Sequence, residues 1–193
     1  MSISKILKFL LLSATLFSCS TPDLVIDQKE DKYEGEWRFD TWGDDCSNQV
    51  DYHPCNFELS DRKGETVSLY DFYGMPIIID FSAMWCGPCQ HAAIEVEDMK
   101  LEFPSIVYIT VLIDNEYGEP PTKEDLSRWA DIFEIREPVL GGSREMMSSN
   151  PDMGWSITSW PTFFYINDNM IIEHTHTGYS STTVRQNIEQ VIR

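Results

Sequence analysis

Residues 80–89 read DFSAMWCGPC, and this stretch decides which fold and which chemistry the sequence can support. It overlaps the end of a β-branched apolar run that begins at Pro76, and it leads into a segment where apolar residues recur at helical spacing. Cys86 and Cys89 therefore stand where a buried strand is expected to give way to a helix. A helix N-terminus carries about half a positive charge and unpaired N–H groups, and both stabilise a thiolate.

A cysteine pair in this position suits thiol–disulfide exchange. The first turn of the helix should lower the pKa of the Cys86 thiol below the free value of about 8.5. Cys89 lies about one turn further on, so its sulfur can reach Cys86 and resolve a mixed disulfide. Gly87 and Pro88 separate the two cysteines, and a proline costs little in a first helical turn, where its missing N–H is not needed.

Three further side chains have spacings that suit this chemistry. Asp80 interrupts the buried strand, where desolvation should raise the pKa of its carboxyl group, and it could accept the Cys89 proton through a water. A strand-edge aspartate paired with a lysine is the alternative for Asp80. Trp85 directly precedes the first cysteine and would shield one side of it. Pro161 begins an apolar strand and is a candidate for a cis peptide bond.

The hydrophobic pattern around the motif predicts alternating strands and helices. Apolar runs without alternation, at 76–82 and 106–113, indicate central strands buried on both faces. Between them, apolar residues at spacings of 4, 3 and 4 predict a helix over 92–103, so these strands should be parallel. Thr122 begins a capping-box pattern and a second helix. The other expected elements are a hairpin of 57–59 and 66–69, antiparallel strands at 162–166 and 170–176, and a last helix over 184–192.

The motif at 80–89 resembles the Asp-Phe-x-Ala-x-Trp-Cys-Gly-Pro-Cys motif of the thioredoxin superfamily, and Trp160-Pro161-Thr162-Phe163 resembles its cis-Pro-Thr stretch. Over residues 55–193 the chain is similar to TlpA/ResA-like proteins, membrane-tethered thiol–disulfide reductases of the bacterial envelope. The resemblance implies an α/β thioredoxin-like fold, with a central mixed β-sheet flanked by helices, an N-terminal β-hairpin extension, and cis-Pro161 beside Cys86. Trp160 is larger than the residue usual before that proline and should narrow the groove where a partner backbone docks.

The first residues resemble an export signal. Lys5 and Lys8 precede an apolar run at 9–17 that is too short to span a bilayer as a helix. Leu16-Phe17-Ser18-Cys19 resembles the bacterial lipobox, which implies cleavage before Cys19 and lipidation of that residue. An incidental cysteine at the end of a simple signal peptide is the alternative.

Composition suggests where the domain boundaries fall. If residues 1–18 are the signal, the polar and acidic residues 19–34 would form a flexible tether. The packed domain is then expected over 35–193, with 35–56 as its N-terminal extension. Residues 114–160 would be an insertion before the cis-proline strand.

Cys46 and Cys55 are the remaining cysteines, and the expected use is a structural disulfide. An exported compartment permits such bonds, and closing a loop of this length contributes roughly 2–3 kcal/mol in the chain-entropy model. Two alternatives stay open. The pair could relay electrons to Cys86 and Cys89, or it could bind a metal together with Asp44, Asp45 and His53.

Histidines and methionines give weaker signals. His174 and His176 share one side of a strand, where a polar sheet face is favoured over a copper or zinc site. His91 stands near the helix start and is expected to face solvent, with tuning of the thiols as the alternative. Met146, Met147 and Met153 are expected to pack rather than bind a soft metal.

The charge of the chain excludes one class of function. Among 193 residues, Lys and Arg number 14 and Asp and Glu 32, giving a net charge of −18. Such a surface repels phosphate backbones, so nucleic-acid binding is not expected. The five cysteines divide into the candidate lipid anchor, the Cys86/Cys89 pair and the Cys46/Cys55 pair.

These features together favour a lipid-anchored enzyme of the cell envelope that reduces protein disulfides. Its partners would be a disulfide-containing protein and an upstream thiol donor, with no cofactor and no metal. The alternatives are a thiol peroxidase of redoxin type and a copper metallochaperone. The threonine that peroxiredoxins carry shortly before their nucleophilic cysteine is missing, because Ala83 and Met84 occupy the stretch just before Trp85.

Overall fold

The computed structural model describes Trp42 and residues 45–193. The expected signal peptide, the candidate lipidation site Cys19, the tether and Asp44 lie outside these residues. Within the described part, no helix combines the length and the apolar character needed to cross a membrane.

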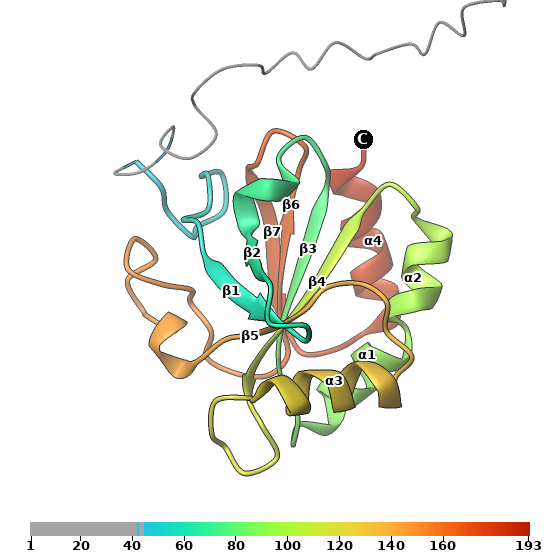
Figure 1. The fold of residues 1–193 in the computed structure, drawn as a ribbon. Coiled ribbons are helices and arrows are strands. Elements are labelled where there is room, and N and C mark those ends of the chain that lie inside the picture. Colours follow the sequence, from blue (N-terminus) through green and yellow to red (C-terminus); the bar gives the residue numbers. More distant parts are fainter. Residues whose placement is uncertain (1–41, 43–44) are drawn as a thin grey trace, which may run out of the picture. The chain divides into compact units, whose positions relative to one another are not determined.

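Seven strands form one mixed sheet (Figure 1). They are β1 (Glu58–Asp61), β2 (Thr66–Ser68), β3 (Ile77–Ala83), β4 (Val107–Asp114), β5 (Val139–Gly141), β6 (Thr162–Ile166) and β7 (Ile172–Thr177). Their order across the sheet is β2-β1-β5-β4-β3-β6-β7. The central strands β3 and β4 are parallel, β6 is antiparallel to β3, and β7 is antiparallel to β6.

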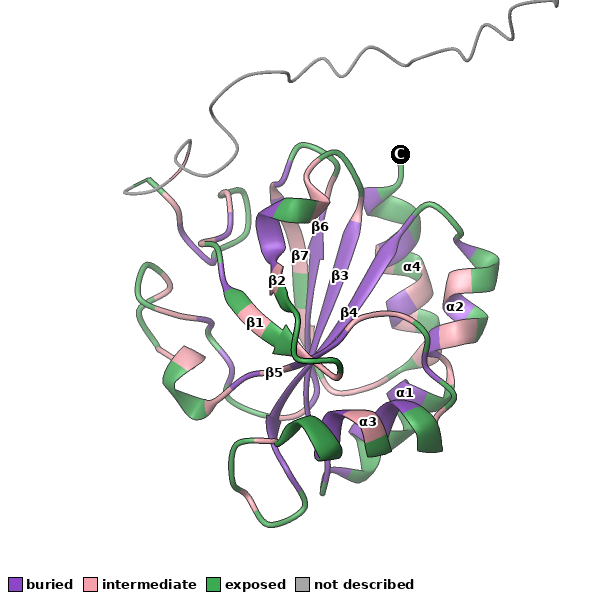
Figure 2. Ribbon diagram, in the orientation of Figure 1, coloured by how far each residue is buried: buried purple, intermediate pink, exposed green. Residues whose placement is uncertain are grey.

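The central strands are covered on both faces, which explains their unbroken apolar sequence. Every residue of β3 and β4 is buried (Figure 2). Successive side chains point to opposite faces, so Ile78 joins the cluster under the helices while Ile77 and Ile79 join a second cluster on the other face. The non-alternating pattern therefore predicted these two strands correctly.

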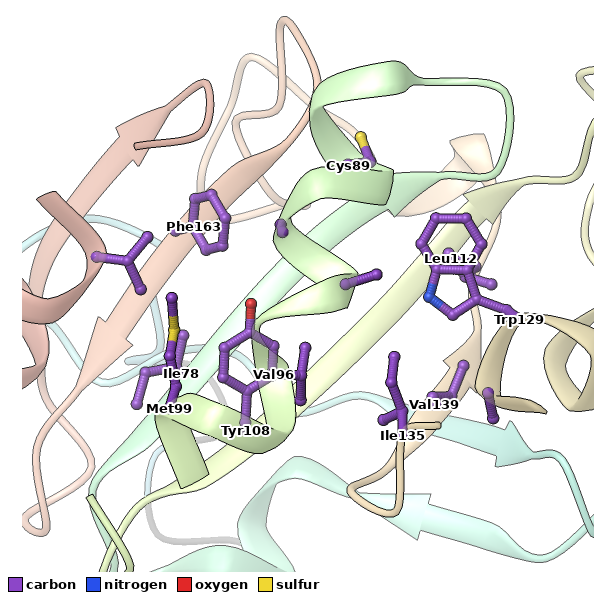
Figure 3. Close-up of a cluster of buried hydrophobic side chains, with 14 of the residues drawn as sticks. Ile78, Cys89, Val96, Met99, Tyr108, Leu112, Trp129, Ile135, Val139 and Phe163 are labelled. Carbon is purple, nitrogen blue, oxygen red and sulfur yellow. The ribbon is translucent and has the colours of Figure 1, made fainter. Parts of the chain in front are cut away.

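Helices cover one face, and mostly irregular segments cover the other. The helices are α1 (Gly87–Ile94), α2 (Val96–Glu102), α3 (Lys123–Ile132) and α4 (Ser181–Val191), and all contribute to the first cluster. Cys89 lies on the first turn of α1 at one end of this cluster, and the Tyr108 hydroxyl points toward the same end (Figure 3). The opposite face is packed by the 3₁₀-helix η1 (Leu69–Phe72) and the loop around Trp155.

Two local expectations need correction. The helix predicted over 92–103 is divided into α1 and α2 at Glu95, although its apolar stripe is buried as expected. The Glu95 carboxylate accepts hydrogen bonds from Ser181 and Arg185 of α4, so this residue serves the packing between helices. The strand β5 was not predicted. It has three residues and pairs with both β4 and β1, so it joins the central sheet to the β1–β2 hairpin.

The capping box predicted at Thr122 is confirmed. Its hydroxyl accepts a hydrogen bond from the Asp125 N–H at 3.2 Å, and the Asp125 carboxylate accepts one from the Thr122 N–H at 2.9 Å. Both bonds satisfy N–H groups that have no partner inside the helix.

We expect Thr122→Ala to lower the free energy of unfolding by about 1 kcal/mol, because it leaves one of these N–H groups unsatisfied. Urea unfolding of the oxidised protein measures this change. Thr182→Ala, on an exposed position of α4, is the matched control and should change stability by less than about 0.5 kcal/mol. Equal effects of the two substitutions would contradict the assigned cap.

A candidate dithiol site at the start of a helix

Cys86 and Cys89 lie together at the N-terminus of α1 and form a disulfide, with 5.2 Å between their Cα atoms. Cys86 is the N-cap residue, and Pro88 occupies the first turn. The Cys89 N–H donates a hydrogen bond to the Cys86 sulfur at 3.2 Å. A donor that would stabilise a thiolate on Cys86 is therefore in place.

The two sulfurs differ in accessibility. Cys86 is 5% exposed and Cys89 is fully buried. Of the pair, only Cys86 keeps any exposed surface, so it is the better placed to meet an incoming disulfide, and Cys89 would act from inside the protein. His91, on the same helix, is exposed, as expected for a histidine that faces solvent.

The Trp160–Pro161 peptide bond is cis, as the resemblance implied. Thr162, the next residue, pairs with Phe81 of β3, so the start of β6 lies beside the end of the strand that leads into the cysteine motif. The Thr162 hydroxyl donates to the Ser159 carbonyl at 2.7 Å and holds this turn. Trp160 is half-buried and packs against both hydrophobic clusters.

Asp80 is buried beneath the helices, and no lysine in the described part of the chain pairs with it, so the structure does not support the ion-paired alternative. Its carboxylate accepts hydrogen bonds from the Ser82 hydroxyl at 2.6 Å and from the Tyr108 hydroxyl at 3.3 Å. Desolvation raises the pKa of Asp80 to about 7, although both hydrogen bonds oppose the shift. This carboxyl group therefore changes its charge near neutral pH.

Tyr108 was not predicted as a partner of Asp80. Tyr108 lies on β4, two residues before Thr110, which pairs in register with Asp80. Alternation along β4 sends both side chains to the face of Asp80, so a correct strand register would have identified them. The Thr110 hydroxyl is buried and has no hydrogen-bond partner among the described residues.

Trp85 is held by a residue that sequence reasoning also missed. The indole N–H donates to Asp114 Oδ2 at 3.3 Å, although the Trp85 side chain remains about half exposed. Asp114 ends β4, and its backbone carbonyl accepts a hydrogen bond from the Met84 N–H at 3.0 Å. Arg144, from the segment expected to be an insertion, pairs with the same carboxylate.

A second disulfide joins Cys46 to Cys55, with 4.8 Å between the Cα atoms. The loop that it closes is fixed to two other parts of the chain. Asn48 N–H donates to the Pro151 carbonyl at 3.0 Å, and Asp51 N–H donates to the Ile172 carbonyl of β7 at 2.8 Å. These contacts favour the structural use of this disulfide over a relay.

The metal alternative for this loop does not fit the structure. Both sulfurs are in the disulfide, and His53 instead places Nδ1 2.7 Å from the Met170 carbonyl and stacks on Trp42. On β7, His176 stacks on Phe163 with 4.8 Å between ring centroids. No group of three His, Cys, Asp or Glu side chains in residue 42 and residues 45–193 is arranged to hold a metal.

Comparison with known proteins gives one family and several relatives. The model of the AhpC/TSA family matches residues 51–175. Thioredoxin-like protein YneN of Bacillus subtilis is 24% identical over 135 residues, which are 70% of this chain and 74% of that protein. Thiol-disulfide oxidoreductase ResA of Geobacillus thermodenitrificans is 25% identical over 141 residues, again 70% of this chain and 74% of that protein.

Solved structures confirm the expected thioredoxin-like fold. A putative thiol:disulfide interchange protein DsbE from Chlorobium tepidum matches with a TM-score of 0.63 and 20% identity, over 76% of this chain and 100% of that one. The exposed lipoprotein thioredoxin Etrx1 of Streptococcus pneumoniae matches with a TM-score of 0.57 and 24% identity, over 70% of this chain and 99% of that one.

We expect replacement of both Cys46 and Cys55 by serine to lower the free energy of unfolding by about 2–3 kcal/mol, because the open loop gains conformational entropy in the unfolded state. Disulfide reduction by the folded variant should be unchanged. Denaturant unfolding and a turbidity assay of disulfide reduction measure the two effects. Loss of turnover in the folded variant would instead support a relay through this pair.

Asp80 should also make stability depend on pH. The folded chain keeps this proton up to about pH 7, whereas in the unfolded chain the carboxyl group loses it near its ordinary pKa of 3.8. Between these values the unfolded state binds fewer protons, so the contribution of Asp80 to the free energy of unfolding falls as pH rises and is lowest above pH 7.

We therefore expect Asp80→Asn to stabilise the protein by about 2 kcal/mol more at pH 8 than at pH 5, because the neutral amide has no charge to bury. Urea unfolding at both pH values measures this difference. Asp152→Asn, at an exposed turn, serves as the control and should change stability by less than about 0.5 kcal/mol. The same result for both variants would show that Asp80 does not titrate in this range.

Proposed function

Because the chain belongs to the AhpC/TSA family and is a thiol–disulfide oxidoreductase of the thioredoxin type, we propose that it reduces protein disulfides in the cell envelope through Cys86 and Cys89. One observation carries the assignment of these residues. The sulfur of Cys86, the residue of the pair that keeps a little exposed surface, caps a helix N-terminus and accepts an N–H bond, while Cys89 is fully buried.

The proposed cycle begins with the reduced pair. The Cys86 thiolate attacks one sulfur of a substrate disulfide, forms a mixed disulfide and releases the other substrate sulfur as a thiolate. Cys89 then loses its proton and attacks the Cys86 sulfur, which releases the second substrate sulfur. The substrate gains two electrons and the Cys86–Cys89 disulfide forms, so an upstream thiol donor must reduce that bond before the next turnover.

Asp80 is the proposed acceptor of the Cys89 proton, through a water. A base is needed inside the protein because Cys89 is inaccessible to solvent. The pKa of Asp80, raised to about 7 by burial, suits a group that takes up a proton and returns it near neutral pH. Pro161 and Trp160 would border the groove in which the substrate backbone docks, with Trp85 on the other side.

Export and lipid anchoring belong to the same proposal. The sequence supports them through the apolar run at 9–17 and the lipobox-like Leu16-Phe17-Ser18-Cys19. The Cys46–Cys55 disulfide suits an oxidising compartment. The pneumococcal structural neighbour is described as an exposed lipoprotein, which agrees with this location.

A thiol peroxidase is the second candidate, and the AhpC/TSA match is the observation that favours it. Here a hydroperoxide would oxidise the Cys86 thiolate to a sulfenic acid and leave as an alcohol. Cys89 would then displace water and form the same disulfide. Against this candidate, Ala83 and Met84 occupy the stretch before Trp85 where peroxiredoxins carry a threonine.

Cys86→Ser should abolish disulfide reduction in the turbidity assay, because the remaining thiol of the pair, Cys89, is fully buried. Cys89→Ser should keep the first step and accumulate mixed disulfides with envelope proteins, which mass spectrometry identifies after non-reducing electrophoresis. The variant lacking both Cys46 and Cys55 is the control for non-specific thiol effects. Peroxide consumption by the reduced wild type that outpaces disulfide reduction, with no trapped protein, would favour the peroxidase instead.

A further inference from the structure

The tryptophan beside Cys86 depends on a buried carboxylate. Asp114, at the end of β4, is 1% exposed. Its Oδ2 accepts the Trp85 indole N–H, and its backbone carbonyl accepts the Met84 N–H. One residue thus fixes both positions immediately before Cys86. A carboxylate this deeply buried is unfavourable unless it is paired.

Arg144 provides the pairing. Its guanidinium forms a fork on the Asp114 carboxylate, with Nε 2.9 Å from Oδ1 and a terminal nitrogen 2.6 Å from Oδ2. Planar, two-point contacts of this kind are among the strongest hydrogen bonds in proteins. Among the described residues, Arg144 is the only cation within ion-pair distance of Asp114.

The segment that carries Arg144 is held close to β4. Arg144 begins the 3₁₀-helix η2 (Arg144–Met146), two residues after Gly142. Gly142 N–H donates to the Leu112 carbonyl at 2.8 Å, and a Cβ at Gly142 would lie 2.8 Å from Ile113 Cδ1. This tight approach delivers the guanidinium to the carboxylate from a part of the chain distant in sequence from the cysteine motif.

We propose that Arg144 is a positioning residue of the dithiol site. Through Asp114 it holds the Trp85 ring beside Cys86, and its positive charge offsets a carboxylate charge that would otherwise disfavour the Cys86 thiolate. The proposal rests on the function proposed above for Cys86. It gives the segment before the cis-proline strand a definite part in the site, which the sequence did not reveal.

The test is the pH dependence of Cys86 alkylation by iodoacetamide in the reduced full chain, followed by mass spectrometry of the Cys86 peptide. Arg144→Gln leaves the Asp114 charge unpaired, so we expect the apparent pKa of the Cys86 thiol to rise by about half a unit to one unit. At a pH below that pKa, disulfide reduction should fall roughly three- to tenfold, in proportion to the thiolate.

Companion variants separate this effect from a loss of stability. Arg144→Lys keeps the charge without the fork and should recover most of the shift. Arg144→Gln combined with Asp114→Asn leaves no unpaired charge and should also return the thiol pKa toward the wild-type value. Arg128→Gln, which breaks an ion pair on α3, is the control and should leave the pH profile unchanged.

Two results would overturn the proposal. One is an unchanged alkylation profile in folded Arg144→Gln. The other is a shift in Arg144→Lys and in the double variant that equals the shift in Arg144→Gln. Lower thermal stability without a shift in the profile would assign Arg144 a structural part only. Failure of the proposed function gives a different result, because wild-type Cys86 would then alkylate like a free thiol and disulfide reduction would be absent.

Discussion

The unpaired N–H groups of a helix N-terminus are the constraint on which the site depends. In α1 a cysteine sulfur caps them, since Cys86 accepts the N–H of Cys89. This arrangement holds only if the strand before the cap and the helix after it are both fixed. The complete burial of β3 and the packing of Ala92 and Ala93 against the sheet provide that rigidity. The same packing encloses Cys89 completely and leaves only a small part of Cys86 exposed.

Two buried carboxylates near this turn are treated differently by their surroundings. Among the described residues, Asp80 receives hydrogen bonds from the hydroxyl groups of Ser82 and Tyr108 and from no cation, so burial prevails and its proton is retained up to about pH 7. Asp114 receives a guanidinium fork from Arg144 and an indole N–H from Trp85. One environment suits proton transfer and the other suits fixed geometry. The difference between the roles of Asp80 and Asp114 follows from their hydrogen-bond partners, because the two carboxyl groups are chemically the same.

Features that depend on neighbouring residues in the chain could be predicted from the sequence. The buried strands, the apolar stripe under α1 and α2, and the Thr122 cap all follow from local spacing. The partners of Asp80 and Asp114 could not be predicted in this way. Tyr108 and Arg144 reach them across 28 and 30 residues, and only the strand register and the approach of Gly142 bring them together. The strand β5 was missed because three residues carry no recognisable period.

Each disulfide joins cysteines that are close in sequence, with separations of 9 and 3 residues. Any exchange of partners among Cys46, Cys55, Cys86 and Cys89 would have to close much longer loops at a larger entropic cost. Oxidation of the unfolded chain is therefore biased toward the two pairs found in the folded protein.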